Sequence, residues 1–130
     1  MLPALAWLTC CAAGPAPATD ARETPCAGAS SQREAEACWS AAARSSEAAV
    51  DAALAQATAS MRAASAQDAD RLREAHDTWL RYRDSHCALY ALRLAGGSAA
   101  PTARAVCRWR LAGEREAELR RLDQAWRPGR

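Results

Sequence analysis

The chain has 130 residues, which is room for one domain, and its formal net charge is +2. All 17 basic residues are Arg, and no run of them alternates with aromatic residues, so the composition argues against nucleic-acid binding. Residues 19–78 carry a net charge of −4 and residues 79–130 a net charge of +6. This imbalance predicts either helices that attract one another or a basic half that faces an acidic partner or a membrane surface.

The first segment, residues 1–18, contains no charged side chain and is mostly apolar from Leu2 to Ala13. That length suits the apolar part of a signal peptide and is too short to span a bilayer. Ala16-Pro17-Ala18 fits a small-residue cleavage site. We therefore expect export, with a mature helical domain over residues 19–130.

A second interpretation of the same segment is a lipoprotein signal. Leu8-Thr9-Cys10-Cys11 resembles a lipobox, in which Cys11 would carry the lipid. Both interpretations place the protein in the periplasm or cell envelope, and we expect membrane attachment only if Cys11 is lipidated.

The first two helices are expected in residues 30–95, which contain neither Gly nor Pro and are rich in helix-forming residues. Ser31-Gln32-Arg33-Glu34 is a capping box that predicts the start of the first helix. One straight helix of this length would extend roughly 100 Å with little to pack against. We expect a break within residues 63–70, where Ser65-Ala66-Gln67-Asp68 offers a second cap.

The second and third helices are predicted over Leu72–Leu94 and Thr102–Ala125, on either side of Gly96-Gly97-Ser98. Glycine tolerates the positive φ that often ends a helix, so this triplet is the expected turn. Because no run alternates β-branched residues, the fold class is all-α, a small antiparallel bundle of about three helices. The apolar positions expected in the core recur at helical spacing: Trp39, Ala43, Val50, Leu54, Ala57 and Met61, then Leu72, Ala75, Trp79, Tyr82, Cys87, Tyr90 and Leu94, then Val106, Trp109, Ala112, Leu119, Leu122 and Trp126.

Four cysteines remain for the folded domain, and an even number in an exported chain predicts two disulfides: Cys26, Cys38, Cys87 and Cys107. Cys87 lies ten residues before Gly97, and Cys107 lies ten residues after it. Residues equidistant from the turn of an antiparallel hairpin lie opposite each other, so this spacing predicts a Cys87–Cys107 disulfide. Spacing alone leaves the two other pairings of the four cysteines open.

The segment from Leu72 to Cys87 also carries a family resemblance. The pattern consists, in order, of Leu72, Ala75, Trp79, Tyr82, Arg83, Asp84 and Cys87, followed by Gly96-Gly97-Ser98, Cys107, Arg115 and Leu119. This pattern resembles the LprI-like lysozyme-inhibitor family, in which Cys26 and Cys38 match an upstream cysteine pair. The chain departs from the family at four positions, where His76 replaces Gln, Ala55 replaces Asn, Thr58 replaces Tyr and Ala112 replaces Thr. The family's Asp-x-x-Leu-Asn-x-x-Tyr element corresponds in this chain to Asp51, Leu54, Ala55 and Thr58.

The resemblance implies an exported envelope protein that binds a partner, with inhibition of a lysozyme-type glycosidase as the leading hypothesis. The alternative is a structural or protein-interaction module of the envelope with no enzyme target. The candidate binding and family-motif residues are Trp79, Tyr82, Arg83, Asp84, Gly96, Gly97, Ser98 and Arg115.

Trp79, Tyr82, Arg83 and Cys87 are spaced to share one helical face. They could form a core seam, in which Arg83 pairs with Asp51 or Glu116 on a neighbouring helix. They could also present Tyr82 and Arg83 to a ligand or protein, since these residue types are common at binding hot spots. The uncharged loop over residues 96–101 is likewise either a connector or a tip that enters a partner's cleft.

The sequence predicts no enzyme activity, no cofactor and no metal. His76 and His86 lie ten residues apart, which does not place them on one helical face as a metal pair. No Cys-x-x-Cys motif supports a redox function, and no nucleophile motif accompanies His76, Asp77 and Glu74.

Overall fold

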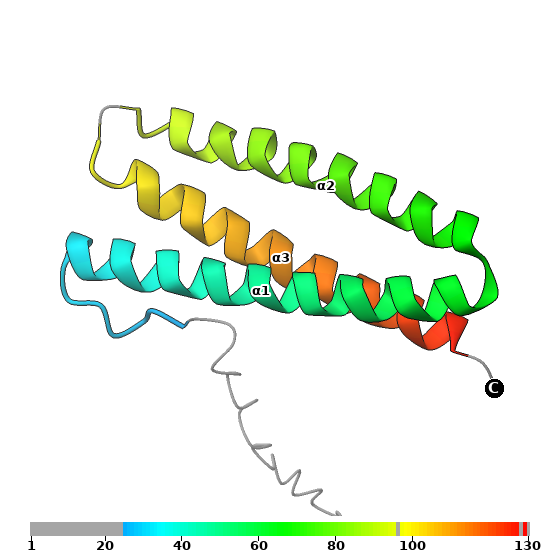
Figure 1. Cartoon of the computed structure of the whole chain (residues 1–130). Coiled ribbons are helices and arrows are strands. Elements are labelled where there is room, and N and C mark those ends of the chain that lie inside the picture. Colours follow the sequence, from blue (N-terminus) through cyan, green and yellow to red (C-terminus); the bar gives the residue numbers. More distant parts are fainter. Residues whose placement is uncertain (1–24, 96, 128, 130) are drawn as a thin grey trace, which may run out of the picture.

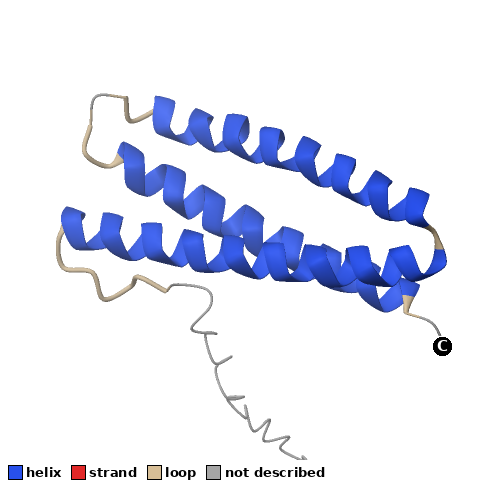
Figure 2. Ribbon diagram, viewed as in Figure 1, coloured by secondary structure: helices blue, strands red, loops and turns tan. Residues whose placement is uncertain are grey.

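The computed structural model describes residues 25–95, 97–127 and 129, so the predicted signal peptide, Cys11 and Gly96 lie outside the described residues. The described chain forms three long helices: α1 (Gln32–Ala64), α2 (Ala66–Leu92) and α3 (Ala100–Trp126). Consecutive helices run antiparallel in one elongated bundle, and the loop between α2 and α3 lies at the same end as the start of α1 (Figures 1 and 2). The all-α prediction is confirmed. Within this part of the chain, none of the helices combines the length and the apolar character that crossing a membrane requires.

Serine caps set the start of α1 and the break between α1 and α2. The Ser31 hydroxyl accepts a hydrogen bond from the Glu34 backbone N–H at 3.2 Å, and Glu34 in turn accepts from the backbone N–H of Ser30 at 2.9 Å. At the break, the Ser65 N–H donates to the Met61 carbonyl at 2.7 Å and closes α1. The Ser65 side chain accepts from the Asp68 N–H at 3.2 Å and opens α2, as predicted.

The turn between α2 and α3 differs from the prediction in its backbone. Gly97 does not adopt a positive φ; among the described residues only Gly129 does. The Gly97 N–H donates to the Leu94 carbonyl at 2.8 Å, and a Cβ at this position would lie 3.2 Å from the same oxygen. Close approach to Leu94 therefore accounts for glycine at position 97.

Both disulfides form, and they pair the cysteines as Cys26–Cys38 and Cys87–Cys107. The Cα atoms of Cys87 and Cys107 are 5.5 Å apart, and both side chains lie inside the bundle. The equal spacing about Gly97 thus predicted the staple between α2 and α3 correctly. The second bond ties the segment that precedes α1 to its second turn.

The core is built mainly where α1 and α3 face each other and where the start of α2 closes over them. Its buried members are small or aliphatic, and the ring of Trp39 meets the edge of Trp109 with centroids 5.2 Å apart. The main cluster consists of Val50, Ala53, Ala57, Met61, Ala69, Leu72, Ala112 and Leu119. An alanine-rich seam allows the helices to approach closely.

The predicted inner face of α2 is partly wrong. Ala75, Tyr82, Tyr90 and Leu94 are exposed, whereas Leu72 and Cys87 are buried as predicted. The other buried positions of α2 are Ala69, His76, Arg83 and Ala91. Cys87 must point at α3 to form its disulfide, and five residues of helix place Tyr82 about 140° away from that direction. The disulfide therefore sets the rotation of α2 and turns Tyr82 outward.

Candidate functional site

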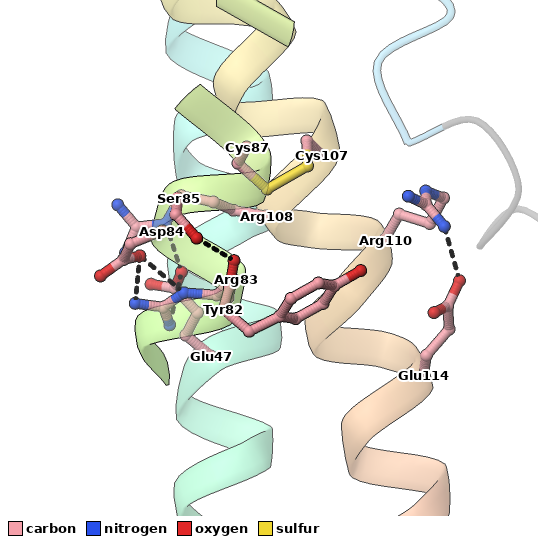
Figure 3. The surroundings of a disulfide bond; sticks show 10 residues. All are labelled: Glu47, Tyr82, Arg83, Asp84, Ser85, Cys87, Cys107, Arg108, Arg110 and Glu114. Atoms are coloured by element: carbon pink, nitrogen blue, oxygen red, sulfur yellow. Dashed lines mark hydrogen bonds and ion pairs between the residues drawn. A yellow bond between two sulfur atoms is a disulfide. The ribbon is translucent and has the colours of Figure 1, made fainter. Parts of the chain in front are cut away.

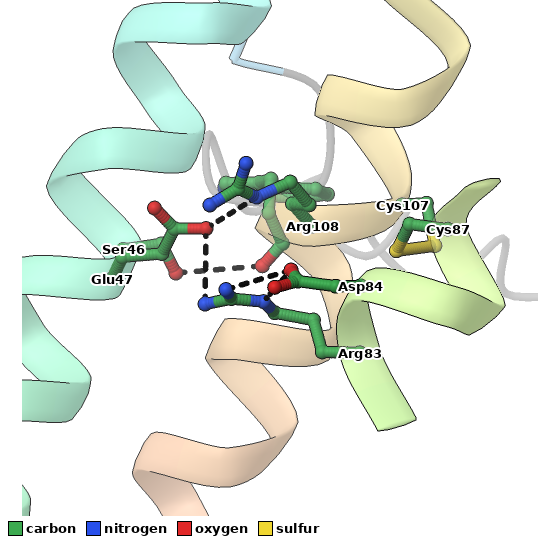
Figure 4. Close-up of polar contacts among 8 residues, drawn as sticks. Ser46, Glu47, Arg83, Asp84, Cys87, Cys107 and Arg108 are labelled. Atoms are coloured by element: carbon green, nitrogen blue, oxygen red, sulfur yellow. Dashed lines mark hydrogen bonds and ion pairs between the residues drawn. A yellow bond between two sulfur atoms is a disulfide. The ribbon is translucent and has the colours of Figure 1, made fainter. Parts of the chain in front are cut away.

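Glu47 of α1 lies at the centre of a charged network that joins all three helices (Figure 4). One of its carboxylate oxygens lies 2.7 Å from the Arg108 Nε and 3.4 Å from an Arg83 terminal nitrogen. Arg83 also donates through Nε and Nη2 to Asp84, at 2.9 and 2.7 Å. These ion pairs connect α1 to both α2 and α3 at one axial position, next to the Cys87–Cys107 disulfide.

The predicted partners of Arg83 are wrong. Glu47 takes the place expected for Asp51, which lies one turn farther along α1, and Glu116 pairs instead with Arg120 at 2.6 Å. One helical turn separates the two candidates on α1, so they share a face and only the axial offset of the helices distinguishes them.

Two guanidinium groups pack against Trp79, which is partly buried. The Arg83 and Arg115 Cζ atoms lie 5.4 and 5.7 Å from its ring centre, and the His76 ring stacks on it at 5.5 Å. Arg83, Arg115 and His76 are each at most 9% exposed. Trp79, Arg83 and Arg115 of the family motif therefore form, with His76, a cluster of cation–π and stacking contacts in which both guanidinium groups are largely shielded from a partner.

His76 has a lowered pKa in this cluster. Burial lowers the pKa of His76 below its ordinary value, and the nearby Arg115 guanidinium lowers it further. Asp51 and Asp77 act in the opposite direction but do not outweigh burial. His76 Nδ1 and two nitrogens of Arg115 have no hydrogen-bond partner among the described residues.

Tyr82 points away from this cluster, although it is adjacent to Arg83 in sequence. Figure 3 shows the two side chains leaving α2 in different directions. Tyr82 is half exposed and stacks on His86 at 5.2 Å, and His86 meets the edge of Tyr90 at 5.5 Å. Of the two neighbouring residues Tyr82 and Arg83, only Tyr82 has a side chain exposed enough to contact a partner.

Four of the five large apolar side chains that the described residues leave exposed lie near one end of the molecule. All five large apolar side chains that the described residues leave exposed are Tyr82, Leu89, Tyr90, Leu92 and Leu94. We call residues 89–95 and 97–101 the hairpin end. Contiguous exposed apolar surface commonly marks an interaction site. No residue from Ser85 to Gly113 is acidic, so this surface is also positively charged.

The hairpin end is held in place by contacts with α1. The Gln32 side chain donates to the Ser98 carbonyl at 3.3 Å and to the Thr102 hydroxyl at 2.9 Å. Ser98 therefore contributes its backbone to the attachment of the loop. Together with the Cys87–Cys107 staple, these bonds attach the start of α3 to α1 and α2.

A groove of about 460 Å³ opens beside the hairpin end, and we call it the hairpin-end groove. Its charged lining comes from α1 and α3: Arg44, Glu47, Arg104 and Arg108. Alanines from all three helices form much of its floor, because a methyl side chain leaves room that larger residues would fill. Sequence reasoning did not single out Arg44 or Arg104; the acid-free stretch around Arg104 was the one available signal.

A second groove of about 510 Å³ lies between α1 and α2. It is lined by residues at the positions of the family's Asp-x-x-Leu-Asn-x-x-Tyr element and by His76. The short side chains of Ala55 and Thr58 stand where the family pattern has Asn and Tyr, and they leave this groove open.

The comparisons with known proteins agree with the cysteine pairs and the helical pattern. A family model described as Lysozyme inhibitor LprI matches residues 25–119. Comparison with curated proteins and comparison with solved structures each find no match. The matched range spans all of α1 and α2, most of α3 and both disulfides. The chain therefore belongs to the LprI family of lysozyme inhibitors.

Proposed function

We propose that this protein is an exported inhibitor of a lysozyme-type glycosidase and that it binds the enzyme through its hairpin end. The observation that carries the proposal is the position of the exposed apolar residues. Leu89, Tyr90, Leu92 and Leu94 all lie in the hairpin end, within the stretch that lacks acidic residues. Membership of the LprI family supports a lysozyme-type enzyme as the partner.

The chemistry of the hairpin end suits the active site of such an enzyme. A glycosidase of this type carries two carboxylic acids in a cleft that accepts a sugar chain. The hairpin end exposes Leu89, Tyr90, Leu92 and Leu94 and carries no negative charge, so it can approach a concave acidic surface without charge repulsion.

Rigidity of the hairpin end favours tight binding. The Cys87–Cys107 disulfide and the Gln32 hydrogen bonds hold the loop before a partner arrives. A loop that is already ordered loses little conformational entropy on binding, which improves affinity. Export is consistent with both disulfides, since disulfides persist in oxidising compartments.

Export and lipidation have their own test. The signal peptide over residues 1–18 and the lipid on Cys11 are predictions, and the mass of the mature N-terminus distinguishes them. A signal peptide cleaved after Ala18 leaves Thr19 as the first residue, whereas a lipoprotein begins at a modified Cys11.

The inhibition assay tests the main proposal. Purified, oxidised protein is added in increasing molar excess to a lysozyme that is digesting peptidoglycan, and the residual activity is measured. We expect inhibition, and we expect the double variant Leu92→Asp and Leu94→Asp to weaken it at least about tenfold, because hot-spot truncations commonly cost 2 kcal/mol or more.

The matched control is Gln56→Asp and Gln124→Asp, which adds the same charge at exposed positions outside the hairpin end. Its inhibition should equal that of the unaltered protein. Full lysozyme activity at a large molar excess would contradict the proposal. Capture of a different envelope partner, with the hairpin end dispensable, would favour an interaction module with no enzyme target.

A further inference from the structure

We infer that the hairpin-end groove is a carboxylate-binding site, in which Arg44 of α1 and Arg104 of α3 receive an acidic side chain of the partner. The identity of that partner rests on the proposed function, whereas the site itself rests on the geometry and charge of the groove.

Arg44 and Arg104 face one groove from two helices, and neither forms an ion pair among the described residues. Six of the twelve described arginines outside the groove contact a carboxylate three or four residues away, as Arg110 and Arg120 do. Arg104 has no acidic residue at these positions, where the sequence carries Ala100, Pro101, Cys107 and Arg108.

Arg44 does have an acidic neighbour three residues along α1, namely Glu47, but that carboxylate is already engaged. Glu47 contacts Arg108 at 2.7 Å and Arg83 at 3.4 Å. The single negative charge in the groove lining is thereby neutralised, and the charges of Arg44 and Arg104 remain available. A second carboxylate is the chemical group that this arrangement lacks.

The shape of the groove suits a side chain. Ala43, Ala91 and Ala105 are buried in its floor, and Pro101 places one edge of the groove beside the loop of the hairpin end. A volume of about 460 Å³ admits an aspartate or glutamate side chain with adjoining backbone. A guanidinium binds a carboxylate through two parallel hydrogen bonds.

The position of the groove also suits the proposed complex. A partner that receives the apolar hairpin end in a cleft would bring the rim of that cleft over Arg44 and Arg104. We assign the carboxylate to a protein, because a recess between three helices accepts a projecting side chain more readily than the broad surface of a bilayer. Binding to anionic lipid is an outcome of the experiment.

The experiment compares two double variants. Arg44→Gln with Arg104→Gln removes the two charges of the groove, and Arg62→Gln with Arg121→Gln is the matched control. The control residues are exposed, form no ion pair among the described residues and carry the same charge. Binding to lysozyme is measured at low and at high salt.

We expect the groove variant to bind lysozyme at least about tenfold more weakly and with a smaller salt dependence, as loss of an interfacial charge pair does. The control variant should bind within about twofold of the unaltered protein. Lysozyme binding that is equal in the two variants would overturn the inference and leave the proposed function intact.

A second measurement does not depend on lysozyme. Glutarate, a small dicarboxylate, is titrated into the unaltered protein while the side-chain Nε–H signals of arginine are followed by NMR. Saturable shifts confined to the signals lost in the groove variant would support the site even if lysozyme is not inhibited. Absence of such shifts, or equal shifts at the control arginines, would overturn the carboxylate site. Binding to anionic vesicles that depends on the groove arginines, without binding of glutarate, would also overturn it.

Discussion

Replacement of Glu47 by Gln tests whether the charged network holds the three helices in register. The substitution keeps the size of the side chain and removes the charge that Arg83 and Arg108 share. Arg83 is only 10% exposed at its side chain, and after the substitution its one carboxylate contact is Asp84, which is itself 60% exposed. The buried guanidinium therefore loses the partner that lies on its inner side.

The expected loss in the free energy of unfolding is about 2 kcal/mol. Removing one partner from a fully buried ion pair costs about 3–5 kcal/mol, and a hydrogen bond to a charged group contributes about 1.5–3 kcal/mol. Asp84 and the partial exposure of Arg108 reduce the loss toward the lower part of this range. For a domain of this size, 2 kcal/mol corresponds to a fall in Tm of about 8–16 °C.

Urea denaturation of the oxidised protein, followed by circular dichroism at pH 7, measures this loss as a shift of the midpoint at constant slope. The matched control is Glu114→Gln, which removes an exposed pair with Arg110 and should cost no more than about 0.5 kcal/mol. If Glu47→Gln is as stable as Glu114→Gln, the network does not set the helix register and the reasoning above is refuted.

Two further predictions concern the buried cluster around Trp79. The pKa of His76 is lowered in the folded protein, so the unfolded chain takes up a proton on His76 at a higher pH than the folded protein does. The free energy of unfolding should therefore fall as the pH drops below about 6.5, by at most about 1.4 kcal/mol per pH unit. His76→Gln should flatten this decline in urea titrations between pH 7.5 and 5 while His86→Gln retains it, and identical slopes in all three proteins would contradict the prediction. Arg115→Met should leave the free energy of unfolding unchanged or raise it by about 1 kcal/mol, because two buried nitrogens of Arg115 have no hydrogen-bond partner in the described part of the chain. A loss above about 2 kcal/mol in thermal or urea unfolding would show that the contacts of Arg115 with Trp79 and Glu118 outweigh that cost.

Features that depend on neighbouring residues could be predicted from the sequence. The Ser31 cap, the break at Ser65 and the helices themselves follow from hydrogen bonds that span three or four residues. The Cys87–Cys107 bond also follows, because an antiparallel hairpin requires only equal distances from its turn. The resemblance carried by the segment from Leu72 to Cys87 agrees with the family that matches the chain.

Features that depend on how one helix lies against another could not be predicted. The choice of Glu47 instead of Asp51 as the partner of Arg83 depends on one turn of axial offset between α1 and α2. The exposure of Tyr82 depends on the rotation of α2, which the disulfide to α3 sets. The hairpin-end groove brings Arg44 and Arg104 together from positions 60 residues apart.

The sequence alone thus determined the helices, their order, the hairpin staple and the family, because each is encoded within a few residues or by a simple spacing. Only the tertiary structure decided which side chains are buried with Trp79 and which surface is left for a partner. The physical reason is that rotation and offset between packed helices arise from many weak contacts acting together, and no short segment of the chain contains them.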